Sequence, residues 1–69
     1  MNPQTTFNPI VEPLMTTEQA AEFIGMKPAA LVQKRFRGEG PPCIRISHRC
    51  VRYNKSDLID WLEKFRQPM

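Results

Sequence analysis

Side chains that can make several hydrogen bonds are concentrated in one short segment, where Gln33, Lys34, Arg35 and Arg37 stand within five positions. A glutamine amide can pair with adenine, and lysine or arginine can donate to guanine or to a phosphate group. This combination of residues is therefore suited to binding a nucleic acid. The alternative is an ordinary solvated helix face that has no partner.

The positive charge of the chain is unevenly distributed. None of the ten lysines and arginines occurs in residues 1–26, and all of them lie between Lys27 and Arg66. The formal net charge is only +3, so the asymmetry rather than the total indicates a basic surface patch on the folded part. A solvated basic face without a partner is again the alternative.

Cys43, His48 and Cys50 form a possible metal-binding trio. We expect no zinc site, because no fourth ligand lies nearby and neither a Cys-x-x-Cys nor a His-x-x-x-His spacing is present. His48 has no apparent nucleophile partner, and the sequence contains no glycine-rich phosphate loop. We therefore predict no catalytic site, no metal and no cofactor.

The elements that must position the polar segment begin with two short helices. A first helix is predicted over residues 17–24, because Thr16 and Gln19 have the spacing of a capping box and Gly25 can end the helix at positive φ. Its apolar side chains are Ala20, Ala21, Phe23 and Ile24. A second helix is predicted over residues 28–37, since Pro28 is favoured at the first position of a helix.

The orientation of this second helix follows from its apolar positions. At about 100° per residue, Pro28, Leu31, Val32 and Phe36 share one side, which we expect to face the core. The opposite side carries Ala30, Gln33, Lys34 and Arg37. Arg35 falls on the apolar side, so we expect it to reach outward from the edge.

A basic hairpin is predicted after the second helix. Glycines and prolines at 38 and 40–42 reverse the chain, and alternating apolar and basic residues then indicate two short strands around a turn at 47–50. We expect the hairpin to bury Ile44, Ile46, Val51 and Tyr53 and to turn Arg45 and Arg52 outward. If Ile46 pairs with Val51, the two cysteines are ~13 Å apart along the ladder, too far for a disulfide.

The last predicted element is an amphipathic helix that follows Asn54, a favourable capping residue. Leu58, Trp61, Leu62 and Phe65 recur at helical spacing and should form its buried face. The two aromatic rings could instead offer a platform for stacking bases. We expect core packing, because a domain of this size needs these rings inside.

The ends of the chain differ from its middle. Prolines at 3, 9 and 13 forbid a regular helix, so we predict a flexible arm over 1–13, a folded domain over 14–66 and a tail over 67–69. A partner-binding arm is the alternative for the first segment. No apolar run approaches a membrane span and no signal peptide is evident, so we expect a cytoplasmic protein without membrane association.

These motifs follow a definite order: a capped helix, a glycine, a second helix, Gly-x-Gly-Pro-Pro, a basic hairpin and Tyr-x-x-x-Asp-Leu-x-x-Trp-Leu. The residues that carry this order are Thr16, Glu18, Ala20, Ala21, Gly25, Pro28, Leu31, Gly38, Gly40, Pro41, Pro42, Val51, Arg52, Tyr53, Asp57, Leu58, Trp61 and Leu62. The set resembles the small winged helix-turn-helix proteins of the excisionase and AlpA-like family, related to the DNA-binding domain of MerR-type regulators. The resemblance implies an α+β, mostly helical fold with helix–helix–hairpin–helix order.

The sequence departs from the family pattern at a few positions. Lys34 stands where an aromatic residue is common, and Ala30 stands where serine or threonine is common. We expect the second helix to be rotated in consequence, with Val32 and Phe36 replacing the missing aromatic residue in the core. The hairpin tip has Ser47 and His48, where glycine is frequent in the family.

The resemblance implies a double-stranded DNA partner, with the second helix in the major groove and the hairpin over an adjacent minor groove or backbone. The predicted DNA-contacting residues are Lys27, Ala29, Ala30, Gln33, Lys34, Arg35 and Arg37 in the helix and Ser47, His48, Arg49 and Arg52 in the hairpin. Lys27 and the first helix amides suit a phosphate, and small alanines allow close approach to the bases.

The resemblance also implies a biological role. Excisionases bind repeated sites cooperatively as several copies, bend DNA and direct an integrase, of the tyrosine or serine type, towards excision in a bacterial or phage-infected cell. A transcriptional regulator of a phage or mobile-element promoter would use the same surface. A protein-binding adaptor that has lost DNA affinity is the third hypothesis.

Overall fold

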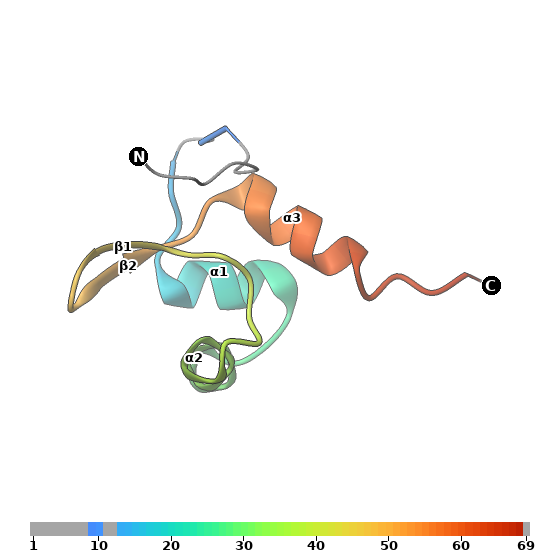
Figure 1. Ribbon diagram of the computed structural model, residues 1–69, viewed down its shortest axis with the longest axis horizontal. Helices are drawn as coiled ribbons and strands as arrows, with labels where there is room; N and C mark the ends of the chain where they lie inside the picture. Colours follow the sequence, from blue (N-terminus) through green and yellow to red (C-terminus); the bar gives the residue numbers. More distant parts are fainter. Residues whose placement is uncertain (1–8, 11–12, 69) are drawn as a thin grey trace.

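The computed structural model describes residues 9–10 and 13–68, and these form three helices and one β-hairpin. The elements are α1 (Thr17–Ile24), α2 (Pro28–Arg37), β1 (Ile44–Ser47), β2 (Cys50–Arg52) and α3 (Lys55–Glu63). The hairpin projects away from the helices, and the chain leaves α3 at the opposite end of the molecule (Figure 1). The predicted winged helix-turn-helix architecture is confirmed. Most of the predicted flexible arm over 1–13, and the last residue of the tail, lie outside the described residues.

Local sequence signals define the ends of the first two helices. Gln19 N donates to Thr16 Oγ1 at 3.1 Å and Thr16 N donates to Gln19 Oε1 at 2.9 Å, so the predicted capping box is confirmed. Gly25 ends α1 with φ of 80°, and Gly38 ends α2 with φ of 72°. Only glycine adopts this left-handed conformation without steric cost. Pro28 occupies the first position of α2, as predicted.

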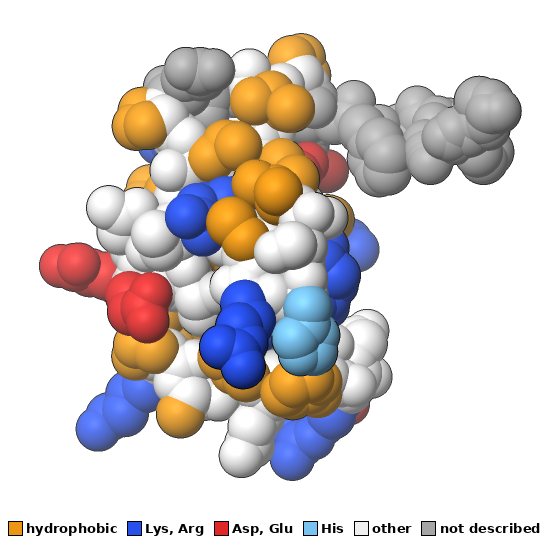
Figure 2. Space-filling model, turned by 90° about the vertical axis from the view of Figure 1, so that its left-hand side faces the viewer, with side chains coloured by type: hydrophobic (Ala, Val, Ile, Leu, Met, Phe, Trp, Pro, Cys, Tyr) orange, Lys and Arg blue, Asp and Glu red, His pale blue; other side chains and the backbone are white. Residues whose placement is uncertain are grey.

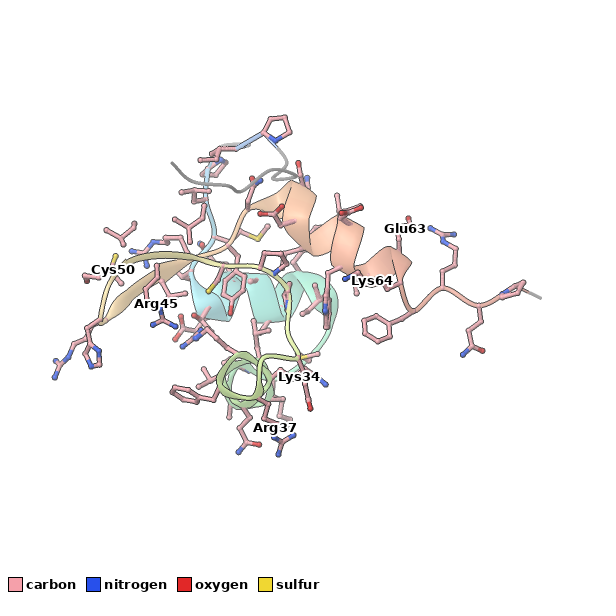
Figure 3. All side chains as sticks on the ribbon, in the orientation of Figure 1. Lys34, Arg37, Arg45, Cys50, Glu63 and Lys64 are labelled. Carbon is pink, nitrogen blue, oxygen red and sulfur yellow. The ribbon has the colours of Figure 1, made fainter. Side chains whose placement is uncertain are left out.

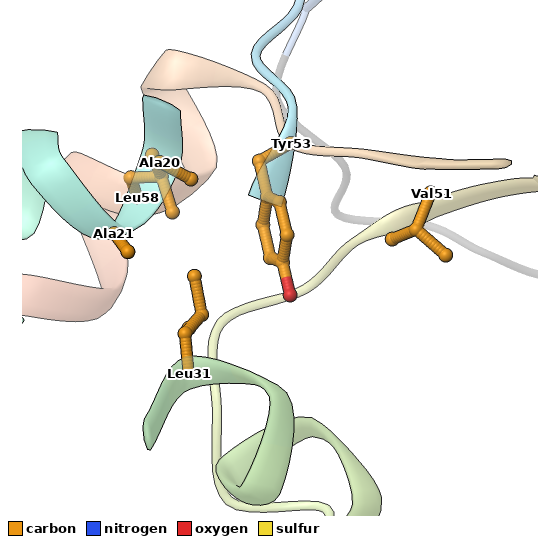
Figure 4. Packing of buried hydrophobic residues seen from close by; sticks show 6 residues of the cluster. All are labelled: Ala20, Ala21, Leu31, Val51, Tyr53 and Leu58. Atoms are coloured by element: carbon orange, nitrogen blue, oxygen red, sulfur yellow. The ribbon is translucent and has the colours of Figure 1, made fainter. Parts of the chain in front are cut away.

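The rotation of α2 differs from the prediction. Leu31 is completely buried and Val32 is half-buried, but 78 % of Phe36 is exposed. The prediction that Phe36 enters the core is therefore wrong. The space beside Leu31 is occupied by the ring of Tyr53, so no aromatic residue from α2 is needed there (Figure 4).

The hairpin contains a β-bulge that the alternating pattern did not predict. Arg45 lies opposite Val51 and Ser47 opposite Cys50, so Ile46 is an extra residue in β1. A bulge redirects the side chain of the inserted residue. Ile46 is 62 % exposed, and the predictions that it pairs with Val51 and is buried are wrong.

The rest of the hairpin follows the prediction more closely. Val51 and Tyr53 are buried and Arg45 is exposed, as expected. Ile44 and Arg52 are both half-buried, whereas Ile44 was expected in the core and Arg52 in solvent. These two residues are register partners and share one face of the hairpin, so they shield each other partly. Both cysteines are free thiols.

Helix α3 contributes fewer core residues than its periodicity predicted. Leu58 and Trp61 are buried, as expected, but Leu62 is 36 % and Phe65 60 % exposed. The helix ends at Glu63, so Phe65 no longer follows the helical period. Its ring instead packs edge-on against Trp61, with ring centroids 4.9 Å apart. The prediction that Phe65 belongs to the core is wrong.

The core lies where α1, α2, α3 and the base of the hairpin meet. It consists of Ala20, Ala21, Leu31, Val51, Tyr53 and Leu58, and Tyr53 stands between the helices and Val51 (Figure 4). Phe23 is 43 % exposed, so the apolar side of α1 is narrower than predicted. The two alanines leave room for Leu31 and Leu58 to approach α1 closely. This small core fixes the position of α2 relative to the hairpin.

Two further contacts secure the hairpin base to the segment before α1. Met15 and Tyr53 exchange backbone hydrogen bonds of 2.9 and 2.8 Å. Asn54, which occupies the predicted N-cap position of α3, is 1 % exposed and its side-chain nitrogen donates to Pro9 O at 2.9 Å. The strand that leaves the hairpin is thereby held in place before α3 begins.

Candidate nucleic-acid interface

A continuous face of α2 is exposed to solvent. It consists of Ala29, Ala30, Gln33, Phe36 and Arg37. At about 100° per residue these positions fall within an arc of about 120° centred on Gln33. We call these five residues the outer face of α2. It presents an amide, a guanidinium and a phenyl ring beside two small residues that permit close approach.

Arg35 does not share this face, because its guanidinium is turned towards the body of the domain. Its Nη1 atom donates to Tyr53 Oη at 3.1 Å and to Thr17 Oγ1 at 3.3 Å. Its Nε atom is buried and has no hydrogen-bond partner among the described residues. Arg35 therefore connects α2 to the start of α1 and to the base of the hairpin.

The two lysines predicted to bind DNA occupy different surroundings. Lys27 is exposed and immediately precedes α2, where the free backbone amides of the helix N-terminus are also found. Lys34 is half-buried and lines an apolar hollow with Met26, Trp61 and Phe65. The structure thus places Lys27 beside the outer face of α2 and Lys34 at its edge.

The hairpin tip carries a group of polar and basic side chains. His48 and Arg49 form the turn between the strands, and both are exposed together with Ser47. Arg52 is half-buried, and its Nη1 atom donates to Val51 O at 3.0 Å. Arg45 adds a further exposed cation on the hairpin (Figure 3).

A groove of about 440 Å³ separates the hairpin from the first two helices. It is lined by Thr16, Thr17, Glu18, Pro28, Ala29, Val32, Arg35, His48, Arg49, Val51 and Arg52. Three arginines and one glutamate make its lining basic. Figure 2 shows this end of the molecule, where basic side chains and the histidine lie close together. The arrangement is able to hold an anionic backbone between a helix and a hairpin.

The model of the helix-turn-helix domain family matches residues 14–66. The chain belongs to this family. Among curated proteins, none matches the chain significantly. Membership of the family indicates a DNA-binding domain, in which α1 and α2 form the helix-turn-helix and the β1–β2 hairpin forms the wing.

Five of the predicted site residues line the groove, namely Ala29, Arg35, His48, Arg49 and Arg52. The other four residues of the outer face of α2 lie outside the groove lining, and Lys34 lines the apolar hollow instead. Sequence reasoning did not select Phe36 or Arg45 as site residues. The alternation of apolar and basic residues in the hairpin sequence indicated that Arg45 is exposed. The apolar side chain of Phe36, in contrast, led to the prediction that it is buried in the core.

The acidic side chains near the interface offset little of its charge. Arg37 Nη1 lies 4.0 Å from Glu39 Oε1, and both side chains are more than half exposed. Such a pair contributes little and is screened by salt. A closer pair, Arg66 with Glu63 at 2.8 Å, lies beyond the interface at the end of α3. There, hydrogen bonding to Arg66 and its charge lower the pKa of Glu63.

The described residues form neither a metal-ligand cluster nor a membrane-spanning helix. Among residues 9–10 and 13–68, no group of three histidine, cysteine or acidic side chains is placed to hold a metal ion. None of the described helices is both long enough and apolar enough to cross a bilayer.

Proposed function

We propose that this helix-turn-helix domain binds double-stranded DNA in a sequence-specific manner, with α2 in the major groove and the wing over the adjacent minor groove or backbone. The main support is that the family model indicates a DNA-binding domain and that α2, through Ala29 and Arg35, lines one groove together with the basic wing tip. A helix fits the ~12 Å width of the major groove, so side chains on its outer face can reach base edges.

The contacting residues have different roles in this proposal. Gln33, at the centre of the outer face, pairs with adenine, and Arg37 meets guanine or a phosphate. Ala29 and Ala30 permit close approach to the bases. Lys27, together with the first amides of α2, binds a phosphate.

The remaining predicted residues act around this centre. On the wing, Ser47, His48, Arg49 and Arg52 contact the backbone or the minor groove. Lys34 contacts a phosphate from the edge of α2. Arg35 lines the groove and also orients α2 relative to the wing through its hydrogen bonds to Thr17 and Tyr53.

We further propose that several copies act together. One domain of this size neutralises about four to six phosphates, so a single copy binds modestly and loses affinity steeply as salt increases. Useful specificity then requires adjacent binding sites or a second protein. This supports an excisionase role in the cytoplasm, in which copies on repeated sites bend DNA and promote excision by an integrase of the tyrosine or serine type.

A transcriptional regulator is the second candidate, because the same DNA-binding surface would serve at a promoter. A protein-binding adaptor is a lesser candidate. It is favoured by the apolar hollow of about 270 Å³ that is lined by Met26, Lys34, Trp61, Leu62 and Phe65. This hollow involves α3 and the end of α2, and it does not include the wing.

A gel-shift titration separates the three candidates. The probes are DNA fragments from both sides of the gene and from any neighbouring attachment site, each tested at low and moderate salt. Ladder-like cooperative shifts on repeated attachment-site motifs support the excisionase role, and a recombination assay with the neighbouring integrase then tests it directly. A single shift confined to a promoter supports the regulator, whereas no shift at low salt contradicts DNA binding.

A matched control is available within the chain. Lys64 follows α3 and is exposed at the opposite end of the molecule from Arg45 and Cys50 (Figure 3). Lys64→Ala removes one positive charge, as Arg49→Ala does, but leaves the proposed interface intact. Binding that depends on Arg49 and not on Lys64 supports a specific surface rather than general attraction by net charge.

A further inference from the structure

Phe36 is the most exposed of the large hydrophobic side chains among the described residues, with 78 % of its surface accessible. It belongs to the outer face of α2 and lies three positions after Gln33, so the two side chains are neighbours on the helix surface. Arg37 follows it, and α2 itself contains no acidic residue. A phenyl ring thus stands within the otherwise polar and basic part of this face.

The ring also contacts the side chain of Arg35. The guanidinium carbon of Arg35 lies 5.9 Å from the centroid of the Phe36 ring, within the range of a cation–π contact. Arg35 is in turn anchored by its hydrogen bonds to Thr17 and Tyr53. Phe36 therefore contacts a residue that is itself hydrogen-bonded to α1 and to the base of the hairpin.

We propose that Phe36 is a specificity-determining residue that packs against the C5-methyl group of a thymine in the major groove. This inference rests on the proposed DNA binding and adds a second base contact to that of Gln33. The thymine methyl is the apolar group that the major groove presents, and phenylalanine is one of the side chains that contact it. The surrounding basic and amide groups favour DNA over an apolar protein surface as the occupant.

The helix geometry predicts where this thymine lies. Gln33 and Phe36 are separated by about 4.5 Å along the helix axis, and successive base pairs are about 3.4 Å apart. The thymine should therefore be one or two base pairs from the adenine that Gln33 contacts. A second methylated base, 5-methylcytosine, also presents a C5-methyl group in the major groove. It should therefore be able to replace thymine as the partner of Phe36 at this position.

The test combines a protein substitution with removal of a single methyl group from the DNA. The preferred site is first selected from random duplexes, and each thymine in it is then replaced singly by deoxyuridine, which lacks only the methyl group. Dissociation constants are measured for the original chain, Phe36→Ala and Phe36→Leu. Phe23→Ala is the matched control, because Phe23 is an exposed phenylalanine on α1 that makes a similar contact with Lys55 at 5.7 Å.

We expect one thymine at which deoxyuridine weakens binding of the original chain by about fourfold, the effect of one buried methyl group. Phe36→Ala should bind the thymine and deoxyuridine duplexes with equal affinity. Phe36→Leu should keep part of the roughly fourfold difference between the two duplexes, and Phe23→Ala should keep all of that difference. Circular dichroism should show that Phe36→Ala remains folded, since the side chain is exposed.

Three results would overturn the inference. If deoxyuridine has no effect at any thymine although the original chain binds its site, the proposed function stands without the Phe36 contact. Phe36→Ala could lose affinity equally on thymine and uracil duplexes, which would assign the ring to holding Arg35 instead. If no duplex is bound at low salt, the proposed function itself fails, and binding of a protein partner that depends on Phe36 would identify the alternative occupant.

Discussion

The inner and outer sides of α2 differ in what they contact, although both carry an arginine. On the inner side Leu31 is completely buried, and Arg35 makes hydrogen bonds to Thr17 and Tyr53. On the outer side Gln33 and Arg37 are exposed. The comparison shows that two arginines two positions apart in a ten-residue helix make different contacts, and that charge alone does not distinguish an inward-facing arginine from an exposed one.

The largest effect is expected on the inner side. Leu31→Ala should lower the free energy of unfolding by about 2–5 kcal/mol, since it removes a buried side chain and leaves a cavity. A domain of this size has on the order of 3–5 kcal/mol of net stability, so most of that stability should be lost and a clear lowering of the melting temperature is expected. Thermal unfolding followed by circular dichroism measures this, with Gln33→Ala as the control in the same helix. An unchanged melting temperature would contradict the observed rotation of α2.

Tyr53→Phe should have the next largest effect on stability. The substitution removes the hydroxyl that accepts from Arg35 at 3.1 Å, at an expected cost of about 1.5–3 kcal/mol for a partly buried hydrogen bond to a charged group. Urea unfolding of Tyr53→Phe, Arg35→Met and the double variant measures the coupling between the two residues. Additive single effects would show that the hydrogen bond contributes nothing to holding α2 in place.

On the outer side, Gln33→Ala should leave stability within about 0.5 kcal/mol of the original, because the side chain is exposed. It should instead weaken binding to the preferred site by about 1–3 kcal/mol and relax the preference at one base pair. Fluorescence anisotropy against a set of single-base variants provides the measurement. Equal weakening on every sequence would remove Gln33 from the base-reading role.

The smallest expected change is in the salt dependence of binding. Arg49→Ala should weaken binding similarly on all sequences and reduce the slope of log K against log salt by about 1, as expected for one lost phosphate contact. Arg52→Ala tests the second proposed DNA-contacting arginine of the wing, which is half-buried, by the same measurement. Lys64→Ala should leave the slope unchanged, and a matching change in that control would attribute the effect to net charge alone.

The order and ends of the helices could be predicted from the sequence because they depend on neighbouring residues. Thr16 with Gln19 satisfies the first amides of α1, Pro28 is compatible with the start of a helix, and Gly25 permits the positive φ between α1 and α2. The spacing of Leu58 and Trp61 likewise indicated the buried side of α3. Each of these signals acts within a few positions of the chain, and none requires knowledge of what packs against it.

The candidate site was less predictable, because exposure depends on contacts between distant segments. Phe36 and Leu31 are both apolar residues of α2, but the ring of Tyr53 fills the space beside Leu31 and leaves Phe36 outside. Arg35 resembles Arg37 in the sequence, yet it meets Thr17 and Tyr53, each eighteen positions away. The polar and basic chemistry of α2 and the wing was thus evident from the sequence, whereas the rotation of α2 that decides which of its residues are exposed arose only when the helices and the hairpin packed together.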